Sequence, residues 1–200
     1  MGFKKNDVNI IQADSLYEGY NSLRNYTLNV KYFNGTTSPD FQRECLHRMP
    51  CVAVIPYDKA KDKIVLLEQF RVGALQDESS PWLYEIVAGV NDKKGEAMLD
   101  VAVRELMEES GLSPLEMSFI MEYWVSPGAS DEKVYLYYAN VDSTKVELYA
   151  GLHEEHEDIK VHVFTFDEAL DLLKSGKIAN GLTIMSLQWL QLNRNNLKKK

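Results

Sequence analysis

A helix-forming segment, Ala97–Ser110, interrupts a series of apolar, β-branched runs and restricts the fold more than any other part of the sequence. Gly95 precedes it, and Gly111 follows where helices commonly end in a left-handed residue. The runs, which predict strands, are Cys51–Ile55, Lys63–Phe70, Leu83–Val87, Phe119–Val125, Lys133–Val141 and Ile159–Thr165. Two further helices are expected, one capped by Asp167 and ending near Ser175, and one from about Thr183 to Asn193. Strands around a central helix predict a mixed α/β fold.

The N-terminal part of the chain is more polar and predicts a separate region. Tyr26–Phe33 alternates like a strand, and Asn34-Gly35 predicts a turn into a second strand at Phe41–His47. We therefore expect an N-terminal β-hairpin region at residues 1–48, beside a main domain at residues 49–200.

Charge and composition narrow the classes of partner. The net charge of −8 argues against nucleic acid, because a phosphate backbone is bound by clustered Lys and Arg. No apolar run approaches the roughly 20 residues that a membrane span needs, so no membrane association is expected. Cys45 and Cys51 have no metal-ligand spacing and fit a reducing compartment. We therefore expect a cytoplasmic protein, whose anionic substrate would require a divalent metal as an intermediary.

The central helix carries an unusual arrangement of carboxylates. At about 100° per residue, Glu105 and Glu109 project on the apolar side of the helix, whereas Glu108 lies with the polar residues Asp100 and Arg104. The apolar side is formed by Met98, Leu99, Val101, Ala102, Val103, Leu106 and Met107. Two like charges one turn apart repel each other, and their burial without compensation is costly. Hard oxygen ligands on a fixed helix suit Mg²⁺ or Mn²⁺ better than zinc.

The segment around this helix resembles the Nudix box, G-x5-E-x7-R-E-U-x-E-E-x-G-U, where U is an aliphatic residue. Arg104–Leu112 fits every specified position of the second half, and the spacing from Glu96 to Arg104 also fits. The one departure is upstream, where six residues rather than five separate Gly89 from Glu96. The resemblance implies the Nudix α/β/α sandwich with a mixed sheet.

The resemblance extends over nearly the whole chain, and the sequence is most similar in its motifs to the bacterial ADP-ribose pyrophosphatase branch of the family. The segments that carry it are Tyr17–Tyr20, Phe41–Glu44, Glu68–Arg71, Ser126–Gly128, Glu155–Val163, Gly176–Asn180 and Leu187–Leu190. In this branch the N-terminal region takes part in a homodimer, so the resemblance implies a homodimer here.

The resemblance also implies roles for individual residues. The metal ligands would be the Ala88 carbonyl, Glu96, Glu105, Glu109 and Glu157. Catalytic roles would fall to Arg104, Glu108 and Glu155, with Glu155 the leading candidate for the general base. Substrate contacts would come from Tyr20, Arg43, Glu44, Arg71, Pro127, Gly128 and Glu132. Among these, Tyr20 would stack on the adenine across the dimer interface, and Arg71 would contact the diphosphate or the terminal ribose.

Several roles have structural alternatives. Arg43 and Arg71 could be structural ion-pair partners, although a guanidinium near a diphosphate suits bidentate binding of phosphate oxygens. Tyr20 could equally be a packed interface residue. Glu155 and Glu157 would face the same side of an extended segment, so the spacing does not decide which of them ligates and which acts as the base.

The predicted reaction is the Mg²⁺-dependent hydrolysis of ADP-ribose to AMP and ribose 5-phosphate. One alternative is hydrolysis of another nucleotide sugar, such as GDP-mannose or ADP-glucose, at the same metal site. A second alternative is a catalytically silent Nudix domain that binds ADP-ribose as a sensor, which the intact Glu105, Glu108 and Glu109 disfavour. A purely structural acidic helix is the third, and it predicts no effect of Mg²⁺ on stability.

Overall fold

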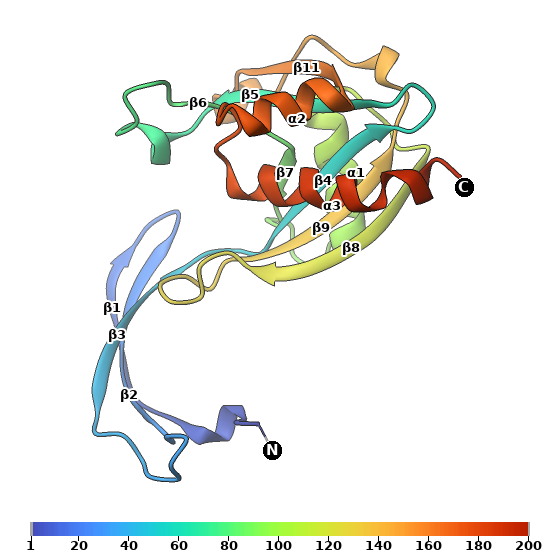
Figure 1. The fold of residues 1–200 in the computed structure, drawn as a ribbon. Coiled ribbons are helices and arrows are strands. Elements are labelled where there is room, and N and C mark those ends of the chain that lie inside the picture. Colours follow the sequence, from blue (N-terminus) through green and yellow to red (C-terminus); the bar gives the residue numbers. More distant parts are fainter. Residues whose placement is uncertain (1, 200) are drawn as a thin grey trace. The chain divides into compact units, whose positions relative to one another are not determined.

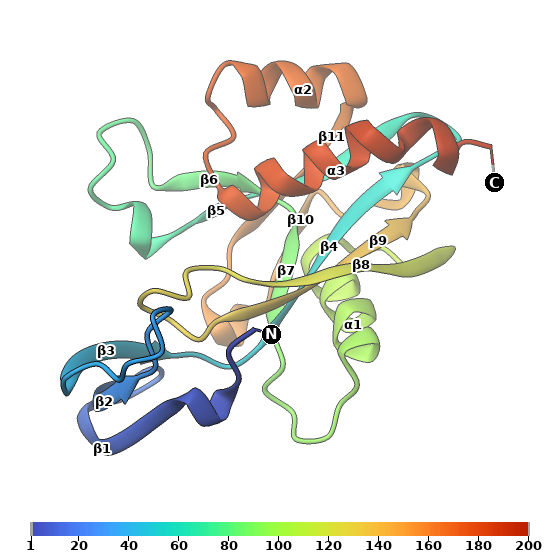
Figure 2. The ribbon, with the colours of Figure 1, turned by 60° about the horizontal axis from the view of Figure 1, so that its bottom comes forward.

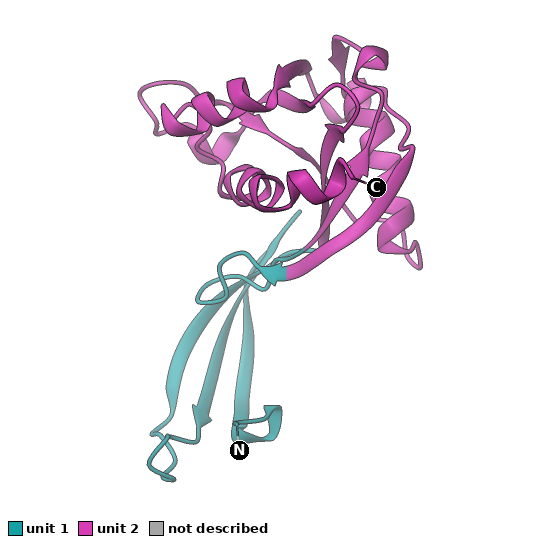
Figure 3. Cartoon of the chain, turned by 45° about the vertical axis from the view of Figure 1, so that its right-hand side comes forward, with its two compact units in different colours: residues 1–50, 123–134 teal, residues 51–122, 135–200 magenta. Residues whose placement is uncertain are grey.

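The computed structural model describes residues 2–199, which form two compact units (Figure 3). Unit 1 contains residues 1–50 and 123–134, and unit 2 contains residues 51–122 and 135–200. Two strands, β8 (Glu116–Trp124) and β9 (Lys133–Asn140), contribute residues to both units. No helix among the described residues is both long and apolar enough to cross a membrane.

Unit 1 is built on an antiparallel three-stranded sheet in the order β1-β2-β3. The strands are β1 (Val8–Glu18), β2 (Ser22–Val30) and β3 (Phe41–His47), and a 3-10 turn at Lys5–Asp7 precedes them. The predicted pairing of a strand near Tyr26 with Phe41–His47 is confirmed, with Tyr26 opposite Arg43. The strand β1 was not expected, because its apolar residues do not alternate regularly with polar ones.

Unit 2 is built on the larger sheet, in the order β10-β11-β5-β4-β9-β8, with β6 paired to β5 and β7 paired to β4. The bounds are β4 (Cys51–Asp58), β5 (Lys63–Phe70), β6 (Trp82–Glu85), β7 (Val87–Val90), β8 (Glu116–Trp124), β9 (Lys133–Asn140), β10 (Tyr149–Ala150) and β11 (Ile159–Thr165). β5 runs antiparallel to β4. Val141 N donates to the carbonyl of Tyr57, so the carboxyl ends of β4 and β9 meet and these neighbours run parallel. The sheet is therefore mixed.

Helices cover both faces of this sheet (Figures 1 and 2). The helix α1 (Met98–Ser110) packs on one face, and α2 (Phe166–Lys174) and α3 (Gly181–Leu197) lie on the other. Side chains alternate along β4, so Val52 and Val54 join the core cluster beneath α1. On the opposite face Tyr138 of β9 contacts Trp189 of α3, with ring centroids 6.1 Å apart. The expected α/β/α sandwich is confirmed.

Three helix details differ from the expectation. The N-cap of α2 is Thr165 rather than Asp167, because the Thr165 hydroxyl accepts from Glu168 N and the Glu168 carboxylate binds back to Thr165. The helix α3 starts earlier than expected, since the side chain of Asn180 caps it by accepting from Thr183 N. On α1, the apolar residues Leu99, Val103 and Met107 are exposed and do not join the buried side.

Candidate active site

Glu105 and Glu109 of α1 are buried against β7, which confirms the face that the helical periodicity predicted for them. Glu105 is 9% exposed and Glu109 is 2% exposed. Glu109 Oε2 accepts a hydrogen bond of 2.9 Å from Ala88 N, at the middle of β7. Glycine at the next position leaves room for this arrangement, because an added Cβ at Gly89 would overlap the carboxylate of Glu105 and displace it. The strand and the helix thus hold two carboxylates side by side.

Burial and mutual repulsion leave these carboxylates poorly compensated. The pKa of Glu105 is raised to about 7, chiefly by burial; Arg104 opposes this rise, and Glu108, Glu157 and Glu155 contribute to it. Burial also raises the pKa of Glu109 well above its usual value, although the Ala88 amide opposes this effect. An uncompensated buried charge of this kind is destabilising unless a cation joins it.

Arg104 connects the other carboxylates of the helix. Its Nη1 lies 2.8 Å from Glu105 Oε1 and 2.9 Å from Glu108 Oε2, and its Nη2 lies 3.4 Å from Glu96 Oε2. Arg104 Nε is buried and has no hydrogen-bond partner within residues 2–199. The loop with the extra residue also contributes, since Asp92 lies 3.4 Å from Arg104 Nη2. The longer loop therefore still brings Glu96 to Arg104.

The loop after β10 supplies the remaining acidic residues. Glu155 is exposed and lies in a 3-10 turn, His153–Glu155, which ends at His156 with φ 57°. An extended segment through Glu155 and Glu157 is therefore not found, because the 3-10 turn begins before Glu155 and ends at His156. Glu157 is more buried, and its Oε2 accepts a 3.3 Å hydrogen bond from Leu152 N. The electrostatic influence of Glu155 and Glu157 on Glu105 places both near α1.

Arg71, which follows β5, forms an ion pair with the buried Glu85 of β6. Its Nε and Nη2 donate to Glu85 Oε2 at 3.0 and 2.7 Å. Burial lowers the pKa of Arg71, but Glu85, Glu109 and Glu157 together outweigh burial and raise it. Arg71 therefore lies within electrostatic range of Glu109 and Glu157 and contacts only Glu85 among the described acidic residues. The structural alternative and a role in substrate binding are both compatible with this position.

The donor set of unit 2 fits a hard divalent cation. Glu105 and Glu109 offer carboxylate oxygens from one face of α1, and burial, followed by neighbouring carboxylates, raises the pKa of both. Carboxylate oxygens without thiol or imidazole are the preferred environment of Mg²⁺ and Mn²⁺. The Ala88 carbonyl, Glu96 and Glu157 stay predicted ligands.

The remaining predicted site residues belong to unit 1. Tyr20 is 76% exposed at the turn between β1 and β2, and Arg43 and Glu44 are exposed on β3. Pro127 and Gly128 lie in an exposed turn, and Glu132 pairs with Arg48 at 2.8 Å. Their roles in substrate binding stay predictions.

A further polar cluster was not found from the sequence. Cys45, His47 and Asp131 each bring one ligand atom within 4.8 Å of the others. His47 Nδ1 lies 2.5 Å from Asp131 Oδ2, and its Nε2 lies 2.8 Å from the Tyr26 hydroxyl, so both ring nitrogens are engaged. No sequence spacing could have indicated this cluster, because Asp131 is distant from His47 along the chain. It belongs to unit 1 and contains none of the predicted ligands.

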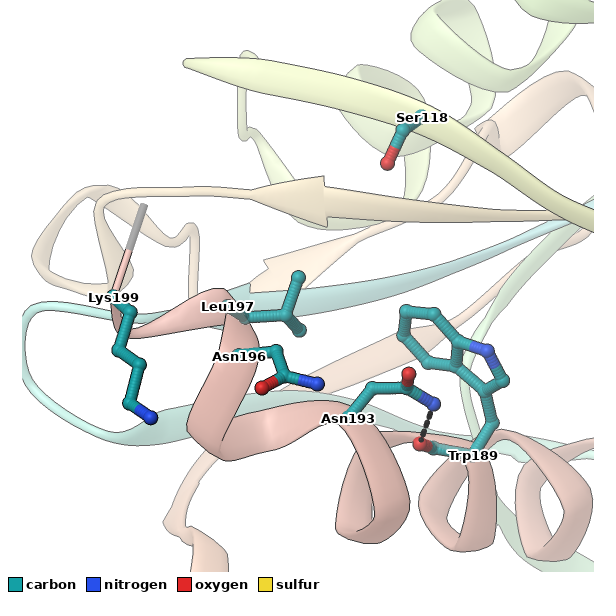
Figure 4. A pocket seen from close by; sticks show the side chains of 6 residues that line it. All are labelled: Ser118, Trp189, Asn193, Asn196, Leu197 and Lys199. Atoms are coloured by element: carbon teal, nitrogen blue, oxygen red, sulfur yellow. Dashed lines mark hydrogen bonds between the residues drawn. The ribbon is translucent and has the colours of Figure 1, made fainter.

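A surface hollow of about 600 Å³ lies between β8 and α3 (Figure 4). It is lined by Ser118, Trp189, Asn193, Asn196, Leu197 and Lys199. This lining offers no carboxylate, so the hollow does not coincide with the candidate metal site.

Comparison with known proteins agrees with this site. The NUDIX domain model matches residues 47–184. The chain is 39% identical over 196 residues to the ADP-ribose pyrophosphatase of Escherichia coli (strain K12), covering 98% of this chain and 93% of that protein. It is 31% identical over 189 residues to the GDP-mannose pyrophosphatase of Enterobacter sp. (strain 638), covering 93% and 96%.

A solved structure described as an ADP compounds hydrolase has the same fold. Its TM-score is 0.69 at 18% identity, and the match covers 95% of this chain and 97% of that one. The carboxylate-bearing helix beside a glycine-containing strand, the α/β/α sandwich and the match over most of the chain lead to one conclusion. This chain belongs to the Nudix hydrolase family.

Proposed function

We propose that this protein hydrolyses the diphosphate of ADP-ribose to AMP and ribose 5-phosphate, with Mg²⁺ as cofactor and Mn²⁺ able to substitute. The single observation that carries the proposal is the buried pair Glu105 and Glu109, held beside Ala88 and Gly89 of β7. The greater similarity to an ADP-ribose pyrophosphatase than to a GDP-mannose pyrophosphatase supports the choice of substrate.

The ligands of Mg²⁺ in this proposal are Glu105, Glu109, Glu96, Glu157 and the carbonyl of Ala88. The bound cation would polarise the phosphoryl group and neutralise charge on its non-bridging oxygens. Because the protein has a net charge of −8, local cationic groups have to attract the anionic substrate.

The side chains of unit 2 carry out the proton transfer and the positioning. Glu155 accepts the proton of the attacking water, since it is exposed and lies on the loop beside Glu157. Arg71 orients the diphosphate with the guanidinium edge that Glu85 does not bind. Arg104 and Glu108 of α1 complete the proposed catalytic residues, and their 2.9 Å ion pair keeps both next to Glu105.

Recognition of the nucleoside is assigned to unit 1. Tyr20 would stack on the adenine, and Arg43 with Glu44 would bind the adenosine side. The exposure of Tyr20 supports this role, because a stacking platform has to present its ring to the ligand. Pro127, Gly128 and Glu132 complete the proposed substrate contacts.

We also propose a homodimer that forms through unit 1. The strand β1 lies at the edge of its sheet and buries no residue. Ile10, Ile11 and Leu16 of this strand are each about half exposed, at 55%, 49% and 51%. An exposed apolar edge strand requires a cover, and a second copy of the chain would supply one. The Cys45 thiol fits the proposed cytoplasmic location.

A turnover assay tests the proposed reaction. The purified protein is incubated with ADP-ribose, ADP-glucose or GDP-mannose, with Mg²⁺ or with EDTA, and the products are separated by chromatography. We expect AMP and ribose 5-phosphate from ADP-ribose and only with metal. Preference for GDP-mannose would replace the substrate assignment. Tight binding of ADP-ribose without turnover would instead identify a sensor.

Light scattering tests the dimer. Ile11→Lys is expected to yield a monomer, because it places a charge on the exposed edge strand. Leu192→Lys is the matched control, since Leu192 is 83% exposed on α3 of the other unit. A monomeric wild-type protein would contradict the proposal.

A further inference from the structure

Glu85 is a buried carboxylate whose two oxygens have separate partners. Oε2 accepts both hydrogen bonds from Arg71, at 3.0 and 2.7 Å, and Oε1 accepts a 2.8 Å hydrogen bond from Asn180 Nδ2. The residue is 4% exposed. Since both oxygens are occupied, the orientation of the carboxylate is fixed, and with it the orientation of the guanidinium.

Asn180 is in turn fixed by the start of α3. Its Oδ1 accepts a 3.1 Å hydrogen bond from Thr183 N, which makes it the N-cap of the helix. The hydroxyl of Thr183, a fully buried residue, accepts from Ile86 N at 3.2 Å, next to Glu85 in the chain. The amide of Asn180 thus connects the helix to the strand segment that carries Glu85.

The guanidinium held in this way has one edge left for a ligand. Glu85 occupies Nε and one face of Nη2, whereas Arg71 Nη1 has no hydrogen-bond partner among the described residues. Arg71 also lies within electrostatic range of two of the proposed metal ligands, Glu109 and Glu157.

We propose that Glu85 and Asn180 are positioning residues that hold the free edge of Arg71 toward the diphosphate of the substrate. This inference rests on the proposed function, because it assumes that a nucleoside diphosphate binds beside Glu109. A guanidinium that is already oriented loses less side-chain entropy when it binds phosphate oxygens. Neither Glu85 nor Asn180 touches the reacting atoms.

Two substitutions separate positioning from stability. Glu85→Gln keeps the shape of the side chain but replaces one accepting oxygen with a donor, so either Arg71 or Asn180 loses its partner. Asn180→Ser keeps a good N-cap for α3 and removes only the donor to Glu85. If Glu85→Gln does not fold, Asn180→Ser still tests the inference.

The test is a double-mutant cycle with Arg71→Ala. In the wild-type background we expect Glu85→Gln to lower kcat/KM for ADP-ribose about 10-fold and Asn180→Ser about 3-fold, mainly through KM. In the Arg71→Ala background each should have less than about a 2-fold effect, because the group they position is gone. Equal effects in both backgrounds would overturn the inference.

Binding of ADP without metal, measured by calorimetry on the same proteins, distinguishes this inference from the proposed function. If the wild-type protein does not hydrolyse ADP-ribose, the proposed function fails. The ADP cycle then decides the inference alone: loss of the Glu85→Gln effect in the Arg71→Ala background supports it. Independent effects, or no ADP binding by the wild-type protein, would overturn it.

Discussion

The substitution Gly89→Ala should displace the Glu105 carboxylate while changing the stability of the fold only slightly. The added Cβ would lie 1.9 Å from the Glu105 carboxyl carbon, and 2.2 and 2.3 Å from its oxygens. Ordinary carbon contacts are about 3.5–4.0 Å, so the carboxylate has to retreat by roughly 1.5 Å or more. The displaced group is the end of a flexible side chain, whose altered rotamer costs about 1 kcal/mol. Replacing a strand glycine offsets about 0.5 kcal/mol of this, so the melting temperature should change little.

Activity should respond far more strongly than stability. A displacement of about 1 Å in a catalytic constellation costs on the order of 100-fold, so kcat/KM for Mg²⁺-dependent ADP-ribose hydrolysis should fall by about that factor. Gly181→Ala is the matched control, since an added Cβ there meets nothing within 4 Å and activity should stay unchanged. A folded Gly89→Ala protein with wild-type kcat/KM would refute the assignment of Glu105 as a ligand.

Three other substitutions test different parts of the structure. Glu109→Gln should lower kcat/KM on the order of 1000-fold, because the cation provides several kcal/mol of transition-state stabilisation. Without metal the variant should melt no lower than the wild type, and a lower melting point would contradict the repulsion between Glu109 and the neighbouring carboxylates. Gly151→Ala should lower activity about 10-fold and the free energy of unfolding in urea titrations by about 1–3 kcal/mol, because Gly151 has φ 97° and an added Cβ would lie 2.9 Å from Glu157 Cβ. Unchanged activity and stability would argue against a rigid loop. Asp58→Asn should lower the free energy of unfolding at pH 7 by about 2 kcal/mol, because the buried carboxylate accepts from Ser143 N and Oγ at 3.0 and 2.8 Å. Burial raises the pKa of Asp58, but the hydrogen bonds outweigh burial and lower it. Its stabilisation is therefore present above the unfolded-state pKa near 4 and is lost as the pH falls through the folded-state value. The gap between wild type and Asp58→Asn should thus narrow in acid, and a constant gap would refute the ionised state.

Two of the expected strands were predicted to the residue, whereas the expected strand Leu83–Val87 is divided between β6 and β7, and the one expected at Phe119–Val125 begins earlier, at Glu116. The structure has β5 at Lys63–Phe70 and β11 at Ile159–Thr165, as the sequence indicates. β5 is a nearly continuous buried apolar run, and β11 begins with buried Ile159 and Val161 on either side of exposed Lys160. The strand β1 was missed, since it buries none of its side chains and so carries little hydrophobic pattern. Its structure depends on antiparallel pairing with β2, which local sequence does not reveal.

The site could be predicted where it depends on helical periodicity. Burial of Glu105 and Glu109 follows from their place among apolar residues of α1, whereas Leu99 on the same predicted arc is exposed. A helical wheel gives the direction of each side chain but not the width of the surface that the sheet covers. The contact of Glu85 with Asn180 joins residues far apart in the sequence, so only the assembled fold could reveal it.

Two arginines of unit 2, Arg71 and Arg104, indicate which carboxylate is left for the cation. Arg104 pairs with Glu105, and Arg71 donates its hydrogen bonds to Glu85. Glu109 receives a hydrogen bond only from Ala88 N within residues 2–199, and Arg71 acts on it through its electric field alone. Its charge is therefore the least compensated, and Mg²⁺ should stabilise the protein chiefly through Glu109. At a concentration 100 times the Kd, binding adds about 2.7 kcal/mol to the free energy of unfolding. Calorimetric melting with and without Mg²⁺ should show this gain in the wild type and its loss in Glu109→Gln, and an equal gain in both proteins would place the cation elsewhere.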